Sequence, residues 1–428
     1  MAEVKTARGA RTGGLGPAGV AVAAAGAAVN ALAFVVPVLG ARMLSAADLS
    51  ALAAVLALGA IASVPGLGLQ AALAVRWARD GRVPSAGRAA AVTAALTGGA
   101  ILLAVPVISA SLRLSPALPV LLTVMTVAVV LASRWLGELQ GRQRFVALSF
   151  GLLLLGVGRY AGVIIGLWMG LGVVGSFVLG ATVAWLALPV LALVTRGRRA
   201  AAGRITGAVD IDDRASVEAG TRGGGASLGR DITAAGGATL AMLAVSYADL
   251  ILARHLLAPA QAGEYAVGSI LTKGALWAPQ VVTILALPRI AQGSRRALLL
   301  ALGVVAACGA VLVTASLLAG GLATGLAGGP GYAGLGRYAP GFAAVGAFYA
   351  IVFVFVNAEI AARVRFPALP LWIALISLAT AAQLLNPPSV AGILRVSLIT
   401  AALTTVAMAI MTLRPRERMT SRSTRRDT

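Results

Sequence analysis

The sequence contains little of what a water-soluble enzyme uses. Charged residues make up 11% of its 428 positions, against roughly 25% in an ordinary soluble domain. It has one histidine, His255, and one cysteine, Cys308, so a disulfide framework cannot form. It also lacks an HExxH pair and a phosphate-binding loop of the GxxxxGK[ST] type. We therefore expect no catalytic residues, no metal site and no resident cofactor.

Apolar residues dominate the composition instead. They occupy 59% of the chain, and about twelve apolar stretches are each long enough to cross a hydrocarbon core of roughly 30 Å as a helix. A water-soluble chain of this size could not bury all of them, so we predict an all-α polytopic membrane protein. The predicted spans are residues 15–40, 50–72, 89–111, 117–136, 146–168, 171–194, 232–253, 263–286, 297–320, 340–361, 368–386 and 390–412.

The positive residues behind the net charge of +21 are distributed unevenly among the connections between the predicted spans. Most of the 35 lysines and arginines fall in alternate connections and in both tails, and few fall in the other connections. This positive-inside pattern predicts cytoplasmic N- and C-termini. The excess of arginine over lysine favours a bacterial source, hence the bacterial cytoplasmic membrane. The basic charge indicates attraction to anionic membrane lipid rather than to nucleic acid.

Two stretches of the chain match each other at one constant offset. Leu44 matches Leu257, and Arg76 matches Arg289. Each half holds six predicted spans, so both halves have one orientation and are parallel repeats. The predicted organisation is a cytoplasmic tail (1–14), a first six-helix bundle (15–195), a flexible cytoplasmic linker (196–231), a second six-helix bundle (232–413) and a basic cytoplasmic tail (414–428).

Lys273 is the first candidate functional residue, because it falls near the middle of the eighth predicted span. Ionisable residues at that depth are expensive and mark functional sites by default. A helical stripe surrounds it and indicates a water-filled cavity; the alternative is a lysine that reaches the membrane surface. The stripe consists of Ser269, Thr272, Lys273, Leu276, Gln280 and Thr283.

Two further ionisable residues lie inside predicted spans. Asp249, in the seventh, has apolar counterparts in the first half, which makes it a candidate site for a coupling ion or proton. The alternative is a structural pairing with Arg254 or Lys273. Arg159, in the fifth, is suited either to an anionic group in a central cavity or to the outer lipid headgroups.

Other residues have two interpretations each. Arg42 and Arg254 occupy like positions at the outer ends of two spans. They form either a basic rim around the cavity or anchors to the lipid headgroups. Pro65 and Pro279 lie at nearly matching positions of the two halves. They are either hinges that let the halves move or prolines of the kind that a membrane helix tolerates. Glu138, four residues from an arginine on each side, predicts helix-surface ion pairs.

Three passages resemble a known family. They are Gly40–Asp48 after the first span, Gly137–Phe145 before the fifth, and Ala248–Tyr265 between the seventh and eighth. Together they resemble the polysaccharide biosynthesis (polysaccharide transporter) family of the multidrug/oligosaccharidyl-lipid/polysaccharide (MOP) exporter superfamily, to which the O-antigen flippases belong. The resemblance extends over about residues 15–413. Ala46 stands where Pro259 stands in the second half, so the first-half turn departs from the family's pattern.

The resemblance implies two six-helix bundles around a central cavity and transport by alternating access. The implied cargo is an undecaprenyl-pyrophosphate-linked sugar, and the implied partners are membrane lipid, a polysaccharide polymerase and glycosyltransferases. Coupling to an H⁺ or Na⁺ gradient is also expected. A pyrophosphate needs cations inside the low-dielectric region. The candidates for cargo binding are Lys273, Arg159, Arg42 and Arg254, with Gln280 as polar lining.

Three other functions compete with a flippase. A cation-coupled multidrug exporter of the same superfamily suits an acidic cavity, whereas cations outnumber acids within these spans. A membrane enzyme of envelope polysaccharide assembly needs clustered acids or a sizeable outer loop, and the predicted outer loops are short. A scaffold that has lost transport would only bind partners. The sequence therefore favours a transporter that is not an enzyme.

Overall fold

The computed structural model describes residues 17–81, 83–196, 221–277, 290, 292, 294–362, 364 and 366–414, and every element in these ranges is helical. The tail 1–14 and nearly all of the tail 414–428 lie outside the described residues. The helices are α1 (Pro17–Met43), α2 (Ala46–Ala62), α3 (Val64–Asp80), α4 (Ala86–Leu112), α5 (Ala117–Gly141), α6 (Phe145–Trp168), α7 (Gly172–Arg196), α10 (Thr221–Leu256), α11 (Pro259–Trp277), α13 (Arg295–Gly328), the 3₁₀ helix η1 (Pro330–Tyr338), α14 (Ala339–Ala361), α15 (Leu369–Gln383) and α16 (Val390–Leu413).

The helices account for the predicted spans. Within the described part of the chain, ten helical segments are long and apolar enough to cross a membrane, with α2–α3 and η1–α14 each counted as one segment. The shorter apolar α15 lies at the eleventh predicted span, and α11 covers the first part of the eighth, whose remaining residues lie outside the described ranges. The prediction of an all-helical, multi-pass membrane protein with about twelve helices is confirmed.

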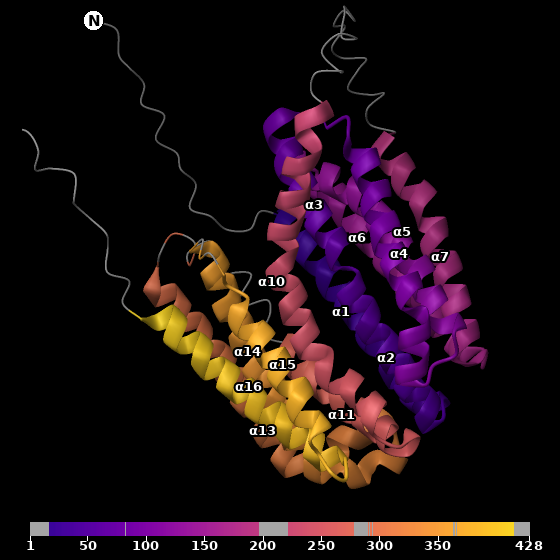
Figure 1. Ribbon diagram of the computed structural model, residues 1–428, viewed down its shortest axis with the longest axis vertical. Helices are drawn as coiled ribbons and strands as arrows, with labels where there is room; N and C mark the ends of the chain where they lie inside the picture. Colours follow the sequence, from indigo (N-terminus) through magenta and orange to yellow (C-terminus); the bar gives the residue numbers. More distant parts are fainter. Residues whose placement is uncertain are drawn as a thin grey trace, which may run out of the picture.

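The helices form two lobes, α1–α7 and α10–α16 (Figure 1). In the first lobe, α5 packs against α3, α4 and α7, while α6 packs against α1 and α7. In the second lobe, α14 packs against α11, α13 and α16. Contacts between the lobes come mainly from α2 and α3 against α10 and α11. These four helices therefore form the seam between the lobes.

Helix boundaries follow the sequence repeat. α1 ends at Met43 and α10 at Leu256, and the next helices begin at Ala46 and Pro259, so both pairs keep the offset that relates Leu44 to Leu257. At the first of these turns, Ser45 accepts a hydrogen bond from the Asp48 backbone N–H at 3.2 Å and so caps α2. α2 and α11 pack together, so the α1–α2 and α10–α11 turns lie at one end of the molecule, which we call the joined end.

Two helices differ from the predicted spans. The second span is longer and is divided at Ser63 into α2 and α3, with Pro65 in the first turn of α3. Proline lacks a backbone N–H and its ring clashes with the carbonyl four residues before it, which accounts for a break there. α10 begins at Thr221, inside the stretch 196–231 predicted as a flexible linker, whose residues 197–220 lie outside the described ranges.

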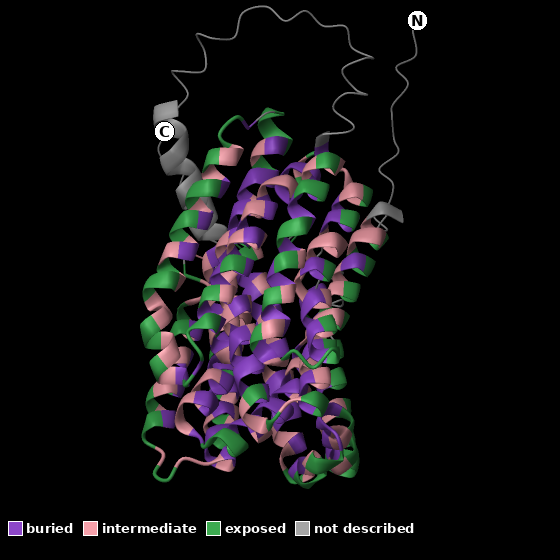
Figure 2. Ribbon diagram, turned by 90° about the vertical axis from the view of Figure 1, so that its right-hand side faces the viewer, coloured by how far each residue is buried: buried purple, intermediate pink, exposed green. Residues whose placement is uncertain are grey.

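Exposed residues lie along the outer helices, and buried residues concentrate in the interior (Figure 2). Many of the exposed residues are large and apolar. Leu103 on α4 is 84% exposed and Leu318 on α13 is 85% exposed. Only 11% of the most apolar window of α4 is buried. Faces of this kind suit lipid tails rather than water.

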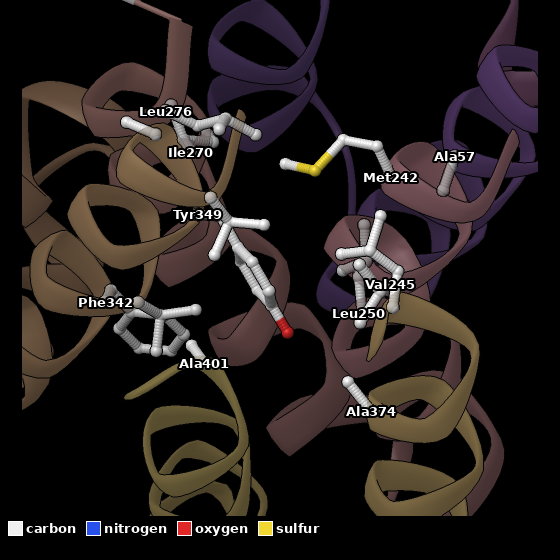
Figure 3. Packing of buried hydrophobic residues seen from close by; sticks show 14 of the residues in the cluster. Ala57, Met242, Val245, Leu250, Ile270, Leu276, Phe342, Tyr349, Ala374 and Ala401 are labelled. Carbon is white, nitrogen blue, oxygen red and sulfur yellow. The ribbon is translucent and has the colours of Figure 1, made fainter. Parts of the chain in front are cut away.

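An apolar core crosses the seam. Ala41, Leu49, Ala53 and Ala57 of the first lobe belong to the same buried cluster as the core of the second lobe. Figure 3 shows Ala57 of α2 beside Met242 of α10 within this cluster. The lobes are therefore in continuous apolar contact along α2.

Gly346 permits close packing inside the second lobe, because a Cβ at this position would meet the Thr272 carbonyl oxygen of α11 and lie 2.8 Å from the Ala275 Cβ. The contact with backbone leaves no room for the methyl group. We expect Gly346→Ala to destabilise the protein by about 1–3 kcal/mol, the usual cost of overpacking. Thermal unfolding in detergent measures it. Gly303→Ala on α13 is the matched control, because nothing lies within 4 Å of its Cβ. Equal melting temperatures for both variants would contradict this account.

Candidate functional site

A cavity of about 230 Å³ lies between the two lobes. Side chains from α1, α2, α6, α10 and α11 form its walls, so both lobes contribute. No acidic residue is among the described residues that line it. The lining consists of Asn30, Ala33, Phe34, Pro37, Ala53, Leu56, Ala60, Ser63, Arg159, Tyr160, Leu243, Tyr247, Leu250, Ser269, Ile270, Lys273 and Trp277.

Lys273 provides a cation on the second-lobe wall. It lies one helical turn beyond Ser269 and one turn before Trp277, which places the three side chains on the cavity face of α11. Its ammonium group donates a hydrogen bond to the Ser246 carbonyl of α10. The same Nζ atom lies 3.6 Å from the centroid of the Tyr247 ring, a cation–π contact. Lys273 therefore has a fixed position, half-buried, at the cavity wall.

Arg159 provides the cation on the first-lobe wall, from α6. Its guanidinium carbon lies 5.3 Å from the centroid of the Tyr160 ring. A Cβ added to Gly59 of α2 would lie 3.0 Å from one of its terminal nitrogens, so the guanidinium packs against that helix. No hydrogen bond from Arg159 to another described residue is found. A guanidinium has five N–H donors, and those of Arg159 face a cavity that also contains Lys273.

The predicted polar stripe on α11 is divided between two environments. Ser269 and Lys273 line the cavity. Thr272 instead donates a hydrogen bond to the Phe342 carbonyl of α14 at 3.0 Å, and Leu276 is buried in the second-lobe core. Gln280 lies outside the described residues, as do Thr283 and Pro279. The stripe is wider than the face that one helix can turn toward a cavity.

Asp249 is buried inside the second lobe, with 2% of its surface exposed, and it does not line the cavity. Its Oδ2 accepts a hydrogen bond from the Tyr265 hydroxyl at 3.0 Å, and its Oδ1 accepts one from the Leu250 backbone N–H at 2.8 Å. The same tyrosine hydroxyl lies 3.5 Å from Ser397 Oγ on α16. Asp249 and Lys273 lie close enough for their charges to attract each other, but the carboxylate and the ammonium group have different hydrogen-bond partners.

A second tyrosine points into the same region. Tyr349 of α14 is 1% exposed, and its hydroxyl has no hydrogen-bond partner among the described residues. Figure 3 shows this hydroxyl directed toward Val245 and Leu250 of α10. An unpaired buried hydroxyl is costly unless something fills its partner's place. The sequence signalled neither tyrosine as a neighbour of Asp249, because both lie on other helices.

The sequence pattern also did not predict the aromatic side chains that line the cavity. Tyr160, Tyr247 and Trp277 line it together with Phe34. For Tyr247, the spacing from Asp249 could have indicated which way the side chain faces. Tyr247 and Asp249 are two residues apart on α10, so they face nearly opposite directions on the helix, and only one can point at the cavity.

Arg42 and Arg254 do not line the cavity. Arg254 is 9% exposed at the joined end, where its Nε donates to the Leu112 carbonyl of α4 at 2.8 Å. Arg42 is exposed and donates to the Leu326 carbonyl of α13 at 3.0 Å. The structure therefore brings Lys273 and Arg159 to one cavity and places these two arginines at contacts between the lobes.

One smaller expectation is also located in the structure. Glu138 forms the predicted ion pair with Arg142 four residues later, at 3.4 Å. Among the described residues, no group of three or more His, Cys, Asp or Glu side chains is arranged to hold a metal ion.

Comparisons with known proteins concern the fold alone. No family model and no curated protein sequence matches the chain. An inward-facing multidrug resistance MATE family transporter of the MOP superfamily aligns over 90% of this chain and 94% of its own, with 16% identity and a TM-score of 0.58. A eukaryotic MATE transporter aligns over 92% and 95%, with 15% identity and a TM-score of 0.58. The lipid II flippase MurJ, in an inward closed conformation, aligns over 92% and 87%, with 11% identity and a TM-score of 0.60. The chain therefore has the two-lobed helical fold of these transporters.

Proposed function

We propose that this protein translocates a polyprenyl-pyrophosphate-linked oligosaccharide, or a related polysaccharide precursor, across the bacterial cytoplasmic membrane by alternating access. Both termini lie in the cytoplasm in this proposal, and the joined end faces outward. The observation that carries the proposal is the charge of the cavity. Arg159 from the first lobe and Lys273 from the second line it, without an acidic residue among its described lining.

An anionic cargo fits this charge. A cation at a low-dielectric cavity wall attracts an anion far more strongly than the same cation in water. A pyrophosphate between Arg159 and Lys273 would contact both lobes at once, so its binding responds to their relative movement. A lysine is a point charge and an arginine offers a planar fork of donors, a combination suited to phosphate oxygens.

The rest of the cavity suits the sugar. Tyr160, Tyr247 and Trp277 offer apolar ring faces together with a hydroxyl or N–H group, which is how aromatic side chains combine apolar and polar contact. The volume of about 230 Å³ is below the 300–1,000 Å³ of typical ligand pockets. In this conformation the cavity therefore holds the charged head of the cargo, and the polyprenyl chain remains in lipid.

A flipping assay tests the function. The purified protein is reconstituted in liposomes with a fluorescent polyprenyl-pyrophosphate sugar, and the fraction that reaches the opposite leaflet is followed by quenching from outside. We expect faster translocation than in protein-free liposomes, and no stimulation with a polyprenyl sugar that lacks the pyrophosphate. Efflux of a cationic drug without any lipid translocation would overturn the proposal in favour of a multidrug exporter. Activity on lipid-linked sugars also implies a polymerase and glycosyltransferases as pathway partners.

A further inference from the structure

Two arginines join the lobes in a reciprocal arrangement at the joined end. Arg42, at the end of α1, donates through Nη2 to the Leu326 carbonyl near the end of α13, at 3.0 Å. Arg254, near the end of α10, donates through Nη2 to the Arg113 carbonyl just beyond α4, at 2.9 Å. Arg113 and Leu326 are equivalent positions of the two halves, related by the offset of the repeat. Each lobe therefore binds the end of α4 or α13 in the other lobe with an arginine from the end of its own first helix.

The chemistry of helix ends explains the choice of arginine. The last four carbonyls of a helix have no partner within it, and the helix dipole makes that end partly negative. A guanidinium donates several hydrogen bonds and carries a positive charge, so it satisfies both requirements. These bonds depend on the lobes being together, because each donor and its acceptor belong to different lobes.

The contacts of Arg254 (the Arg254 arm) are stronger than the contact of Arg42 (the Arg42 arm). Arg254 is 9% exposed and also donates to the Leu112 carbonyl at 2.8 Å, to the Ala47 carbonyl at 2.9 Å and to Ser50 Oγ. It therefore holds both α4 and the first turn of α2. Arg42 is exposed and has a single acceptor outside its own lobe within the described part of the chain. Burial strengthens charge-assisted hydrogen bonds, whereas water weakens exposed ones.

Further contacts reinforce the Arg254 arm from the opposite direction. Arg113 of the first lobe donates to the carbonyl of His255 at 2.8 Å and to that of Leu257 at 3.3 Å, both at the end of α10. His255 Nδ1 in turn donates to the Ser111 carbonyl of α4 at 2.7 Å. The ends of α4 and α10 thus satisfy each other's carbonyls across the seam.

We propose that Arg42 and Arg254 form a duplicated latch that keeps the joined end shut, with the Arg254 arm carrying most of the closing free energy. Opening of this end exposes the carbonyls of α4 and α10 to water and releases the Arg254 side chain. The latch therefore sets the resting equilibrium between the shut and open forms, whatever cargo the cavity takes. The latch acts on the conformation of the protein, so its effect does not depend on the identity of the cargo.

A distance measurement tests the latch. Spin labels are placed on the exposed positions Ser115 of the first lobe and Gln261 of the second, with Cys308→Ser to remove the native thiol. Double electron–electron resonance on the full chain in liposomes then gives the distribution of distances across the joined end. We expect Arg254→Ala to raise the ratio of open to shut molecules about tenfold or more, because the lost bonds exist in only one state. Arg42→Ala should change it several-fold less.

Arg337→Ala is the matched control, since it removes an exposed arginine of the second lobe next to the joined end that contacts its neighbour Tyr338. It should leave the distribution unchanged. A wild-type distribution in Arg254→Ala, or a larger opening in Arg42→Ala, would overturn the proposal. If Arg254→Ala does not fold, Arg254→Lys and Arg113→Ala are measured instead. Both should increase the open population, and a wild-type distribution in both counts against the latch.

Discussion

Replacement of Lys273 by alanine is expected to slow the flipping of a polyprenyl-pyrophosphate sugar about 10- to 100-fold. Hydrogen bonds to charged groups contribute about 1.5–3 kcal/mol, and each step of about 1.4 kcal/mol corresponds to a factor of ten. Lys273 is the cation that the second lobe contributes to the cavity wall. Without it, an anionic cargo loses its charged contact with that lobe, so that binding and lobe movement are no longer linked.

The fold should tolerate this change. The partners of Lys273 are the Ser246 carbonyl and the Tyr247 ring. Tyr247 lines the cavity and Ser246 is the residue before it, so water from the cavity can replace the ammonium group. The comparison of Lys273→Ala with Lys273→Arg then separates charge from shape, because the arginine keeps the charge. Flipping is measured in proteoliposomes, and gel filtration reports the folding of each variant.

Arg395→Ala is the matched control for lost positive charge. This arginine is exposed on α16 and its side chain bonds to the Ala391 carbonyl of its own helix. It should flip cargo at the wild-type rate. Equal flipping by Lys273→Ala and Arg395→Ala would remove Lys273 from the cargo site. Arg159→Ala gives the complementary test, and the double variant should lose less than the sum of the two losses if both side chains bind one pyrophosphate.

The architecture could be predicted from the sequence because it depends on local and additive features. Apolar length gives the spans, and the offset between Leu44 and Leu257 gives the repeat, which the helix boundaries follow. The break at Ser63 was harder to predict, because a proline such as Pro65 is tolerated inside many membrane helices. Its effect depends on the packing around it.

The site could be predicted only in part, because depth in the membrane does not determine which way a side chain faces. Lys273 and Arg159 were found as deep cations, and both line the cavity. Arg42 and Arg254 carry the same charge at like positions, yet they bind helix ends across the seam. The sequence around an arginine does not indicate which carbonyl of the other lobe it will bind. Tertiary contacts of this kind require the structure.

We propose that Asp249 holds the coupling cation, H⁺ or Na⁺, within the second lobe. The carboxylate is buried with Tyr265, whose hydroxyl lies 3.5 Å from Ser397 Oγ. The hydroxyl of Tyr349, which has no hydrogen-bond partner among the described residues, points toward the same helix. Oxygen ligands of this kind suit a small cation, and a carboxylate also binds a proton. Asp249 is buried beside Tyr265 and does not line the cavity, whereas Lys273 does, although the two charges attract each other. Cation and cargo would therefore occupy separate places on the two helices α10 and α11.

Replacement of Asp249 by asparagine is expected to abolish the response to an ion gradient. One pH unit across the membrane corresponds to about 1.4 kcal/mol per coupled proton. A protein coupled to one ion therefore concentrates cargo in one leaflet up to about tenfold for a tenfold gradient. Asparagine is close in size to aspartate and still accepts the hydrogen bond from Tyr265, but it carries no charge and does not titrate. Asp249→Asn should equilibrate the labelled lipid between leaflets without concentrating it.

Two variants separate this role from a structural one. Asp48→Asn removes an exposed acid at the start of α2 and should keep the gradient response. Tyr349→Phe removes a hydroxyl that has no hydrogen-bond partner among the described residues. It should therefore leave the melting temperature unchanged, because no bond is lost, yet it should weaken the gradient response if that hydroxyl faces the ion. A purely structural aspartate predicts another pattern: Asp249→Asn would slow flipping equally with and without a gradient, and Tyr349→Phe would respond like the wild type.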